Sequence, residues 1–568
     1  DLERIEVMKS PGSVLFGSGA LGGAIQMITR RAPFAAASRW SGEWTEGVSA
    51  VDGGASHALS AERSAERTAL RVSAAYRDGD DTSTPRGDLL NSKYTDWNLG
   101  TSLGVRTWGG QSLFASWQRS QAENTGIPGG SPFAATATAT YRLAMRERFA
   151  LEYLLPNLTA RLPLLTVRLS HQDIARNVEI LQSPTVTVTP HATHATASAQ
   201  VESRLLPATN HVLTVGAEAW QRRLDSRRER VLAATNRTVG ERPVPRSSNA
   251  SAGLYAQDDW TVAHDRLRVV LGARRDWSRT RNDATLNPDY VIIGGIRQEP
   301  TPGQTLLWSA GSSRDQSWDA SAGLHAQLAP VVAARLLVAT AYRSPSLEER
   351  YQYLDLGGVL HVGDPQLRPE RSRSVNLGAR AELRSLTLDA DVFLNALTDL
   401  VTETAGTFQG RSAFVKTNVG EARLYGFECS AELRLGARHA VSASLASVRG
   451  EDTGRHVELP QVAPIAAGAE WSVDGARAGT LRVGLTATHA QDRPAPDEAR
   501  TAGWTTWRAA WTSAPWNAAR ASFRVRAGCD NLFDRAYRRH LSTLRGLVRL
   551  EPGRAAWLSV NASFGGAR

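Results

Sequence analysis

The sequence predicts an all-β protein, a transmembrane antiparallel β-barrel of about 22 strands. Three observations support this prediction. Apolar and polar residues alternate in long runs, short connections alternate with long ones, and tryptophan is frequent, at 16 of 568 residues. Alternation of period two is typical of strands with one apolar and one polar face. Because tryptophan favours the boundary between lipid and water, a membrane barrel fits better than a soluble sandwich or propeller.

The alternation is clearest in three segments. In residues 385–395, leucine, alanine and valine occupy the even positions, and polar residues occupy most of the odd ones. Residues 556–564 repeat the pattern up to Phe564, and residues 267–274 show it again. Each of these strands is expected to turn its apolar side chains to lipid.

The connections between the expected strands are of two kinds. Short ones include residues 62–67 and 107–110. Long ones, rich in Gly, Pro, Asp and Ser, are expected at residues 78–91, 122–140, 228–248, 279–304, 357–369 and 450–464. This alternation is typical of outer-membrane barrels, which have short periplasmic turns and longer extracellular loops. A membrane-crossing strand needs about 9–11 residues, so one barrel accounts for the whole length after residue 34.

Composition excludes several other classes of protein. With only two cysteines, Cys429 and Cys529, the chain cannot be a disulfide scaffold, and no apolar run is long enough for a membrane-spanning helix. The formal net charge is +10, but the arginines are spread singly along the chain, which argues against nucleic-acid binding. Since no catalytic or metal-ligand spacing occurs, we predict no enzyme activity, no metal site and no cofactor.

One glycine-rich motif near the start has two interpretations. Residues 17–22, Gly-Ser-Gly-Ala-Leu-Gly, match the GxGxxG pattern of dinucleotide-binding loops. However, Pro11 and Gly12 separate this loop from the preceding strand, and residues 24–29 are expected to form a strand rather than a helix. We therefore favour a tight turn in which glycine allows positive φ angles and close backbone packing.

The same region resembles the end of the plug domain of TonB-dependent outer-membrane receptors. The resemblance rests on Arg-Ile-Glu-Val at residues 4–7, the glycine run at residues 17–23 and Ile-Gln-Met-Ile-Thr at residues 25–29. Further segments match motifs of this family in family order: residues 253–260, 342–351, 363–370, 418–428 and 530–537. The resemblance therefore covers essentially the whole chain.

The resemblance implies two domains. Residues 1–34 would be the C-terminal part of a plug domain in the barrel lumen, and residues 35–568 the transmembrane β-barrel. A complete plug is expected to need further residues before Asp1. The family also implies a monomer in the outer membrane of a Gram-negative bacterium, surrounded by lipid and lipopolysaccharide and energised by the TonB–ExbB–ExbD system.

The function implied by the resemblance is active import of a scarce nutrient chelate, with no chemistry on the substrate. We favour a ferric siderophore, because guanidinium groups suit anionic chelates. Haem or cobalamin is the alternative ligand, and a passive porin-like barrel is a further alternative.

Two sets of candidate site residues follow. Residues beside one expected extracellular loop are the candidate ligand contacts: Arg343, Arg350, Tyr351, Tyr353 and His361. If the ligand were haem, the resemblance implies that His361 would be an axial ligand. Residues expected to anchor the segment 1–34 through ion pairs with the inner wall are Arg4, Glu6 and Arg30.

Overall fold

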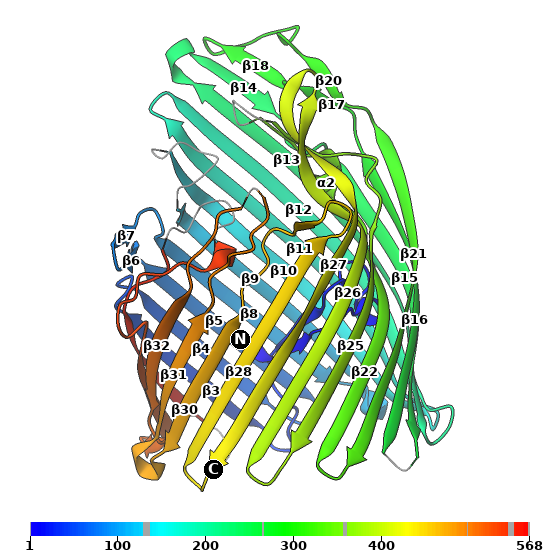
Figure 1. Ribbon diagram of the computed structural model, residues 1–568, viewed down its shortest axis with the longest axis vertical. Coiled ribbons are helices and arrows are strands. Elements are labelled where there is room, and N and C mark those ends of the chain that lie inside the picture. Colours follow the sequence, from blue (N-terminus) through cyan, green and yellow to red (C-terminus); the bar gives the residue numbers. More distant parts are fainter. Residues whose placement is uncertain are drawn as a thin grey trace.

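The computed structural model is a closed antiparallel β-barrel (Figure 1). It describes residues 2–128, 137–263, 266–355, 360–496, 498–542 and 550–565. Within these ranges 22 long strands follow one another around the wall, and β3 closes the barrel by pairing with β35. The predicted all-β barrel is therefore confirmed.

The barrel strands run in chain order around the wall. They are β3 (Arg39–Ser49), β4 (Ala55–Ser64), β5 (Thr68–Gly79), β8 (Tyr94–Arg106), β9 (Ser112–Ile127), β10 (Thr138–Thr159), β11 (Leu162–Ser183), β12 (Val186–Leu205), β13 (His211–Leu232), β15 (Ser247–Val262), β16 (Leu267–Asn282), β21 (Gly311–Ala329), β22 (Val332–Arg343), β25 (Glu370–Glu382), β26 (Leu386–Phe408), β27 (Arg411–Leu435), β28 (His439–Asp452), β30 (Ala466–Asp474), β31 (Thr480–Thr488), β32 (Trp504–Thr512), β34 (Ala521–Asp530) and β35 (Ala555–Phe564).

Shorter elements lie in the connections and inside the barrel. In the connections these are β6 (Thr82–Thr84), β7 (Gly87–Leu89), η1 (Trp108–Gly110), η2 (Ala233–Thr235), β14 (Arg237–Glu241), β17 (Thr285–Asn287), β18 (Tyr290–Ile293), β19 (Ile296–Arg297), β20 (Thr305–Trp308), α2 (Leu347–Tyr351), β23 (Tyr353–Asp355), β24 (Leu360–Val362), β29 (Val457–Glu458), η3 (Ala476–Ala478) and β33 (Trp516–Ala518). Inside are β1 (Leu2–Met8), α1 (Ser13–Phe16) and β2 (Ala24–Thr29). No helix among the described residues has the length and apolar character needed to cross a membrane.

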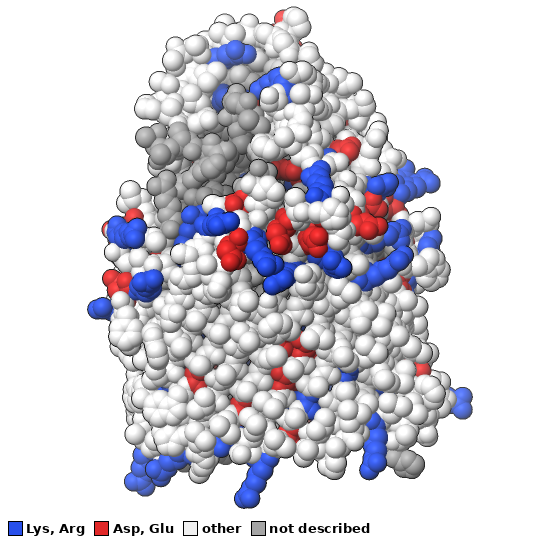
Figure 2. All heavy atoms as spheres, viewed as in Figure 1, with Lys and Arg blue, Asp and Glu red and all other residues white. Residues whose placement is uncertain are grey.

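The alternation predicted from the sequence separates the two faces of the wall. In β26, Leu388 and Val392 are exposed on the outside, whereas Asp389 and Asp391 pair with Arg335 of β22 on the inside. Exposed apolar residues of this kind ring the barrel: Leu59, Leu103, Phe149, Leu169, Leu254, Leu271, Leu324, Val338, Leu377, Leu445 and Leu558. Figure 2 shows the result, a largely uncharged belt below a dense band of charged side chains. This belt is the surface that faces lipid.

The two ends of the barrel differ in their connections. At one end, strands are joined by short turns such as residues 160–161 and 330–331, and at the other by long segments such as 80–93, 283–310 and 344–369. Strands β10 and β11 have 22 residues each, twice the ~9–11 needed to cross a bilayer, so this part of the wall rises above the membrane. The loops expected at 122–140 and 228–248 are consequently shorter than expected.

Residues 2–29 lie in the lumen (Figure 1). Strands β1 and β2 form an antiparallel two-stranded sheet of their own, with no β-ladder to the wall among the described residues. Between them, α1 contacts the wall strands β15, β16, β21 and β22. The glycine-rich residues 17–23 continue this contact at the extracellular end of β22, where the Gly19 amide donates to the Tyr342 carbonyl.

Candidate functional site

Direct hydrogen bonds fasten the glycine-rich turn to the inner wall. The Gly19 amide donates to the Tyr342 carbonyl at 3.0 Å. The Ser344 amide donates to the Ser18 hydroxyl at 3.1 Å, and the Leu21 carbonyl accepts from Asn395 at 3.3 Å. The turn therefore sits against β22 and β26, close to where the wall opens into the extracellular loops.

Gly17 explains why this turn needs glycine. Its φ is +70°, and a Cβ at this position would lie 2.9 Å from Arg274 and 3.1 Å from Glu218. Arg274 is fully buried and pairs with Asp276 and with Glu218. The turn thus covers a buried charge network, and a larger residue would displace it. This supports the tight-turn interpretation of the GxGxxG pattern.

Ion pairs connect other parts of the N-terminal segment to the wall. Arg30 pairs with Glu43 of β3 at 2.9 Å, as proposed from the sequence for that residue. Lys9 pairs with Glu428 of β27, and Arg31 pairs with Glu152 of β10 at 2.5 Å. Sequence reasoning missed Lys9 and Arg31, although both flank the strands that it had identified.

Arg4 and Glu6 differ from the expectation. They pair with each other at 2.7 Å rather than with the barrel wall. The physical reason is that residues two apart on a strand project from the same face, so Glu6 is the nearest carboxylate to Arg4. The side chains of both residues are about half exposed.

The two arginines proposed as ligand contacts form ion pairs within the protein. Arg343 donates to Glu349 at 2.8 Å and also to Glu370. Arg350 pairs with Asp315 at 2.8 Å and donates to the Pro365 carbonyl at 2.9 Å, with only 2% of its side chain exposed. Because carboxylates neutralise both guanidinium groups, these arginines hold α2 at the mouth of the barrel.

Helix α2 is held in place by contacts at its N-terminus and by packing on one face. Ser346 and Glu349 form a capping box at its start. Burial alone would raise the pKa of the Glu349 carboxyl, but hydrogen bonds from Arg343 and from the Ser346 amide lower it below its ordinary value. On this face, Leu347 and Tyr351 pack against Leu224 of β13. The helix is therefore a rigid part of the mouth.

The remaining three candidates lie in or beside the same region. Tyr351 and Tyr353 are buried, and Tyr353 belongs to an apolar cluster with Trp308 and Leu360. His361 keeps a quarter of its side chain exposed. Its Nδ1 lies 3.3 Å from the Glu403 carboxylate, and its ring stacks on Phe414. Of the five candidates, His361 is thus the one with substantial side-chain exposure and no buried ion pair.

A strip of arginines on the inner wall was not predicted. Arg146 and Arg148 of β10 face the lumen beside Arg176 of β11, and Arg222 of β13 lies two strands further on. We call these four residues the arginine wall. The signal that could have found the two arginines of β10 is its alternation, because Phe149 and Leu151 point outward and the even-numbered Arg146 and Arg148 therefore point inward.

In the part of the chain that the structure describes, three members of the arginine wall have no opposite charge to neutralise them. Within the described ranges, Arg146, Arg148 and Arg176 form no ion pair, and Arg146 donates to the neutral Gln172 at 2.7 Å. Arg222 donates to His194 at 2.9 Å and pairs with Glu348 of α2. A cavity of about 210 Å³ between residues 29–31 and the wall is lined by Arg148, next to Arg31 and Arg168. The lumen therefore offers several arginine donors to an anion.

Metal coordination by the protein itself finds no support here. No group of three or more His, Cys, Asp or Glu side chains in the described part of the chain is arranged to hold a metal ion. The arginine donors that face the lumen suit the binding of a preformed anion by charge-assisted hydrogen bonds.

Comparison with known proteins identifies the family. Residues 56–532, most of the chain, match the family described as "TonB dependent receptor-like, beta-barrel". The chain belongs to the TonB-dependent receptor family. Proteins of this family are receptors and transporters of the Gram-negative outer membrane rather than enzymes, so the outer membrane is the location of this barrel. The resemblance noted in the sequence is thereby confirmed.

Individual relatives of this TonB-dependent receptor share limited sequence identity. The chain is 23% identical over 483 residues to the iron-regulated outer membrane virulence protein of Vibrio cholerae, covering 79% of this chain. It spans 63% of the length of that relative. It is 29% identical over 253 residues to the heme/hemopexin utilization protein C of Haemophilus influenzae, covering 39% of this chain and 34% of that protein.

The fold has close counterparts among solved structures. The copper transporter OprC superimposes with a TM-score of 0.82 at 18% identity, over 99% of this chain and 86% of that one. At this identity the similarity shows a shared fold and does not indicate which ligand this TonB-dependent receptor binds.

Proposed function

We propose that this receptor is an active importer of an anionic metal chelate, with a ferric siderophore as the favoured class. Residues 35–568 are the barrel, and residues 1–34 are the C-terminal part of the plug. The observation that carries the proposal is the arginine wall, in which Arg146, Arg148 and Arg176 face the lumen without a carboxylate partner among the described residues.

The arginine wall supports an anionic ligand for two reasons. Guanidinium groups donate paired hydrogen bonds to carboxylate and other oxyanion groups, each contributing about 1.5–3 kcal/mol when charged groups are involved. In addition, a narrow wall of one charge sign raises the local concentration of oppositely charged solutes. An importer of a scarce chelate benefits from both effects.

The attachment of residues 1–34 supports a plug that can be displaced. The ion pairs Arg30–Glu43 and Lys9–Glu428 are largely solvent-exposed, and exposed pairs of this kind contribute only about 0–1 kcal/mol each. The segment also has no β-ladder to the wall in the described ranges. A mechanical pull from the TonB–ExbB–ExbD system would therefore meet separable contacts rather than a continuous sheet.

Haem import is the second candidate function. The relative named for heme/hemopexin utilization supports it, since 253 residues align at 29% identity. His361 supports it as well. The Glu403 carboxylate beside Nδ1 would fix the orientation of the ring and leave the other nitrogen, Nε2, as the one that could coordinate iron. The two candidates differ in which residues should matter: the arginine wall for a siderophore, and His361 for haem.

The test combines a ligand panel with two matched variants. An iron-starved host lacking its own receptors would be supplied with carboxylate, hydroxamate and catecholate siderophores, haem or cobalamin. The triple variant Arg146→Gln, Arg148→Gln, Arg176→Gln should weaken uptake of the accepted chelate by roughly tenfold or more, since each lost charged contact costs at least 1.5 kcal/mol. The control is the periplasmic triple variant Arg434→Gln, Arg477→Gln, Arg520→Gln, which removes the same charge from the short-turn end.

Two outcomes would overturn the proposal. Equal uptake in the two triple variants would contradict a role of the arginine wall in ligand binding. Uptake that persists in a host without TonB would favour a passive porin-like barrel instead.

A further inference from the structure

The outer face of β16 and β21 carries an arginine cluster that the lumen site does not use. Residues at odd positions of β16 point away from the lumen, as shown by exposed Leu271 and Trp277, whereas Arg274 and Asp276 between them are buried inside. Arg275, Arg279 and Arg281 therefore lie on the outside. In register, Arg279 stands directly opposite Arg314 of β21, and Arg275 opposite Trp318.

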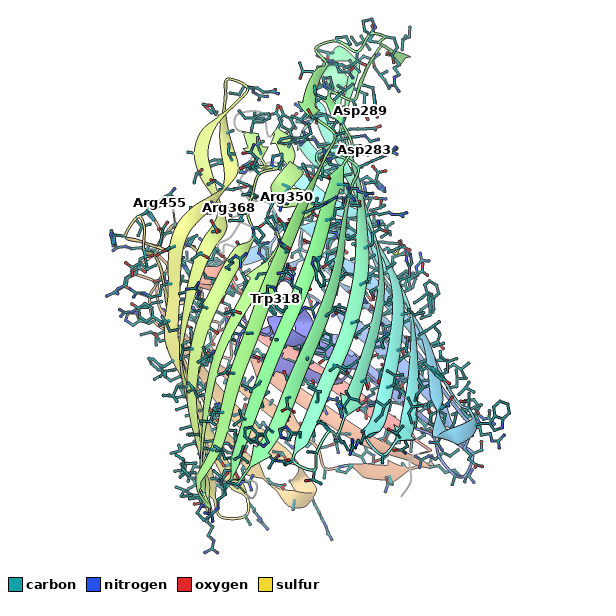
Figure 3. The ribbon with its side chains drawn as sticks, turned by 90° about the vertical axis from the view of Figure 1, so that its right-hand side faces the viewer. Asp283, Asp289, Trp318, Arg350, Arg368 and Arg455 are labelled. Carbon is teal, nitrogen blue, oxygen red and sulfur yellow. The ribbon has the colours of Figure 1, made fainter. Side chains whose placement is uncertain are left out.

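The outward residues change in character along the strands. Toward the short-turn end, the outward positions are Leu271 opposite Ala322 and Ala273 opposite Ala320. Next come the exposed rings of Trp277 and Trp318, with the Arg275 guanidinium 5.6 Å and 5.1 Å from their centroids. Figure 3 shows Trp318 on this wall, below Asp283 and Arg350. Apolar, then aromatic, then cationic residues follow the order of acyl chains, interface and headgroups in a leaflet.

Among the described residues, no carboxylate pairs with Arg279, Arg281 or Arg314. Arg281 and Arg314 lie close enough to Arg279 to repel its charge, and the buried Nε of Arg279 has no hydrogen-bond partner among the described residues. None of the three forms an ion pair in the described part of the chain. Like charges directly opposite each other on neighbouring strands destabilise a sheet. An anion bound between Arg279 and Arg314 would remove this repulsion.

Nearby carboxylates do not supply that anion. Asp225 of β13 is already shared by Arg227, Arg242 and Arg246. Asp283 follows Arg281 by two residues, but the two form no ion pair within the described ranges. The same level of the wall also carries exposed Arg223 of β13, in register with Ser248 of β15 and, through it, with Arg281. Three of four neighbouring strands, β13, β16 and β21, therefore contribute arginines to this level of the outer face.

We propose that the outer face of β16 and β21 is a docking site for a phosphorylated glycolipid of the outer leaflet. Arg279, Arg281 and Arg314 bind its headgroup phosphate, and Trp277 and Trp318 pack at the level of its ester groups. Phosphate matches the paired donors of arginine, and an arginine on a lipid-facing strand is tolerated near the interface but is strongly destabilising at the midplane of the bilayer. A lipid is favoured over a soluble anion because the cluster continues directly into the apolar belt.

The test measures lipid retained by the purified barrel. The receptor would be extracted from outer membranes in mild detergent, and phosphorylated glycolipid per protein counted by native mass spectrometry. The variant Arg279→Gln, Arg281→Gln, Arg314→Gln should retain at least about tenfold less lipid, because it loses all three charged donors to the headgroup phosphate. The periplasmic triple variant (Arg434, Arg477 and Arg520 to Gln) has the same net charge and should retain wild-type amounts.

Further arms separate a lipid from a free phosphate and from misfolding. Added lipid A should restore binding to delipidated wild type, whereas dephosphorylated lipid A and inorganic phosphate should not. The heat-modifiable gel shift of a folded barrel checks each variant, and Arg314→Gln alone serves if the triple variant fails to fold. Equal retention in the cluster and control variants would overturn the proposal, as would full rescue by inorganic phosphate. Since these side chains face away from the lumen, chelate binding should stay unchanged, so this result is independent of the proposed function.

Discussion

Arg350 of α2 and Asp315 of β21 form a buried ion pair at 2.8 Å, with 2% and 11% of their side chains exposed. The pair joins a short helix in an extracellular connection to a strand of the wall, and the Pro365 carbonyl accepts a second hydrogen bond from Arg350. A buried charge that loses its partner is costly, so this contact decides whether the mouth of the barrel keeps its shape.

Replacing Asp315 with Asn should loosen α2 without unfolding the barrel. Breaking one side of a buried pair costs about 3–5 kcal/mol, and here the cost falls on residues 344–355. Hydrogen exchange of these residues should become faster in Asp315→Asn, while the wall strands keep their protection. The matched control is Glu299→Gln, which breaks the exposed Arg297–Glu299 pair and should change exchange little. Unchanged protection of α2 would contradict the assigned role.

Particular residues show which features could be predicted from the sequence and which could not. Alternation in residues 385–395 correctly placed Leu388 and Val392 outside, because the period of a strand is a local property. The roles of Arg343 and Arg350 could not be obtained in this way. Their partners Glu370 and Asp315 are 27 and 35 residues away in the chain, and only the folded mouth brings them together. The same holds for Arg146, Arg148 and Arg176 of the arginine wall, because their lack of a carboxylate partner among the described residues depends on the register of neighbouring strands.

The capping box of α2 should make the mouth sensitive to acid. The pKa of Glu349 lies below its ordinary value of 4.5 in the folded protein, so its carboxylate stabilises α2 above pH 4.5, and this contribution is lost as the pH falls through the lower folded value. Hydrogen exchange, corrected for its intrinsic pH dependence, should show α2 losing protection in acid. In Glu349→Gln the acid-dependent part should disappear, and a wild-type profile in that variant would refute the link.

Gly17→Ala should weaken the attachment of residues 9–23 to the barrel wall. The added Cβ would meet Arg274 at 2.9 Å and Glu218 at 3.1 Å. The backbone at Gly17, with φ of +70° and ψ of −153°, is also a conformation essentially restricted to glycine, which disfavours any residue with a Cβ by about 1–3 kcal/mol. Proteolysis within residues 9–23 should become faster in the folded barrel. Gly22→Ala is the control, because a Cβ there has no atom within 4 Å and no positive φ. Equal cleavage of the two variants would argue against a close fit at Gly17.

His361→Ala decides between the two candidate ligands. If a siderophore is imported, we expect uptake of the accepted chelate to stay within about twofold of wild type, because most contacts around a binding surface contribute little individually. If haem is imported, loss of an axial imidazole should abolish haem-dependent growth. The control is His456→Ala, which removes a strongly exposed histidine from another extracellular connection. The assay is growth on haem and on the siderophore panel in a host without other receptors. We expect the siderophore outcome, because Arg146, Arg148 and Arg176 face the lumen without a carboxylate partner among the described residues. Growth on haem that is lost only in His361→Ala would overturn it.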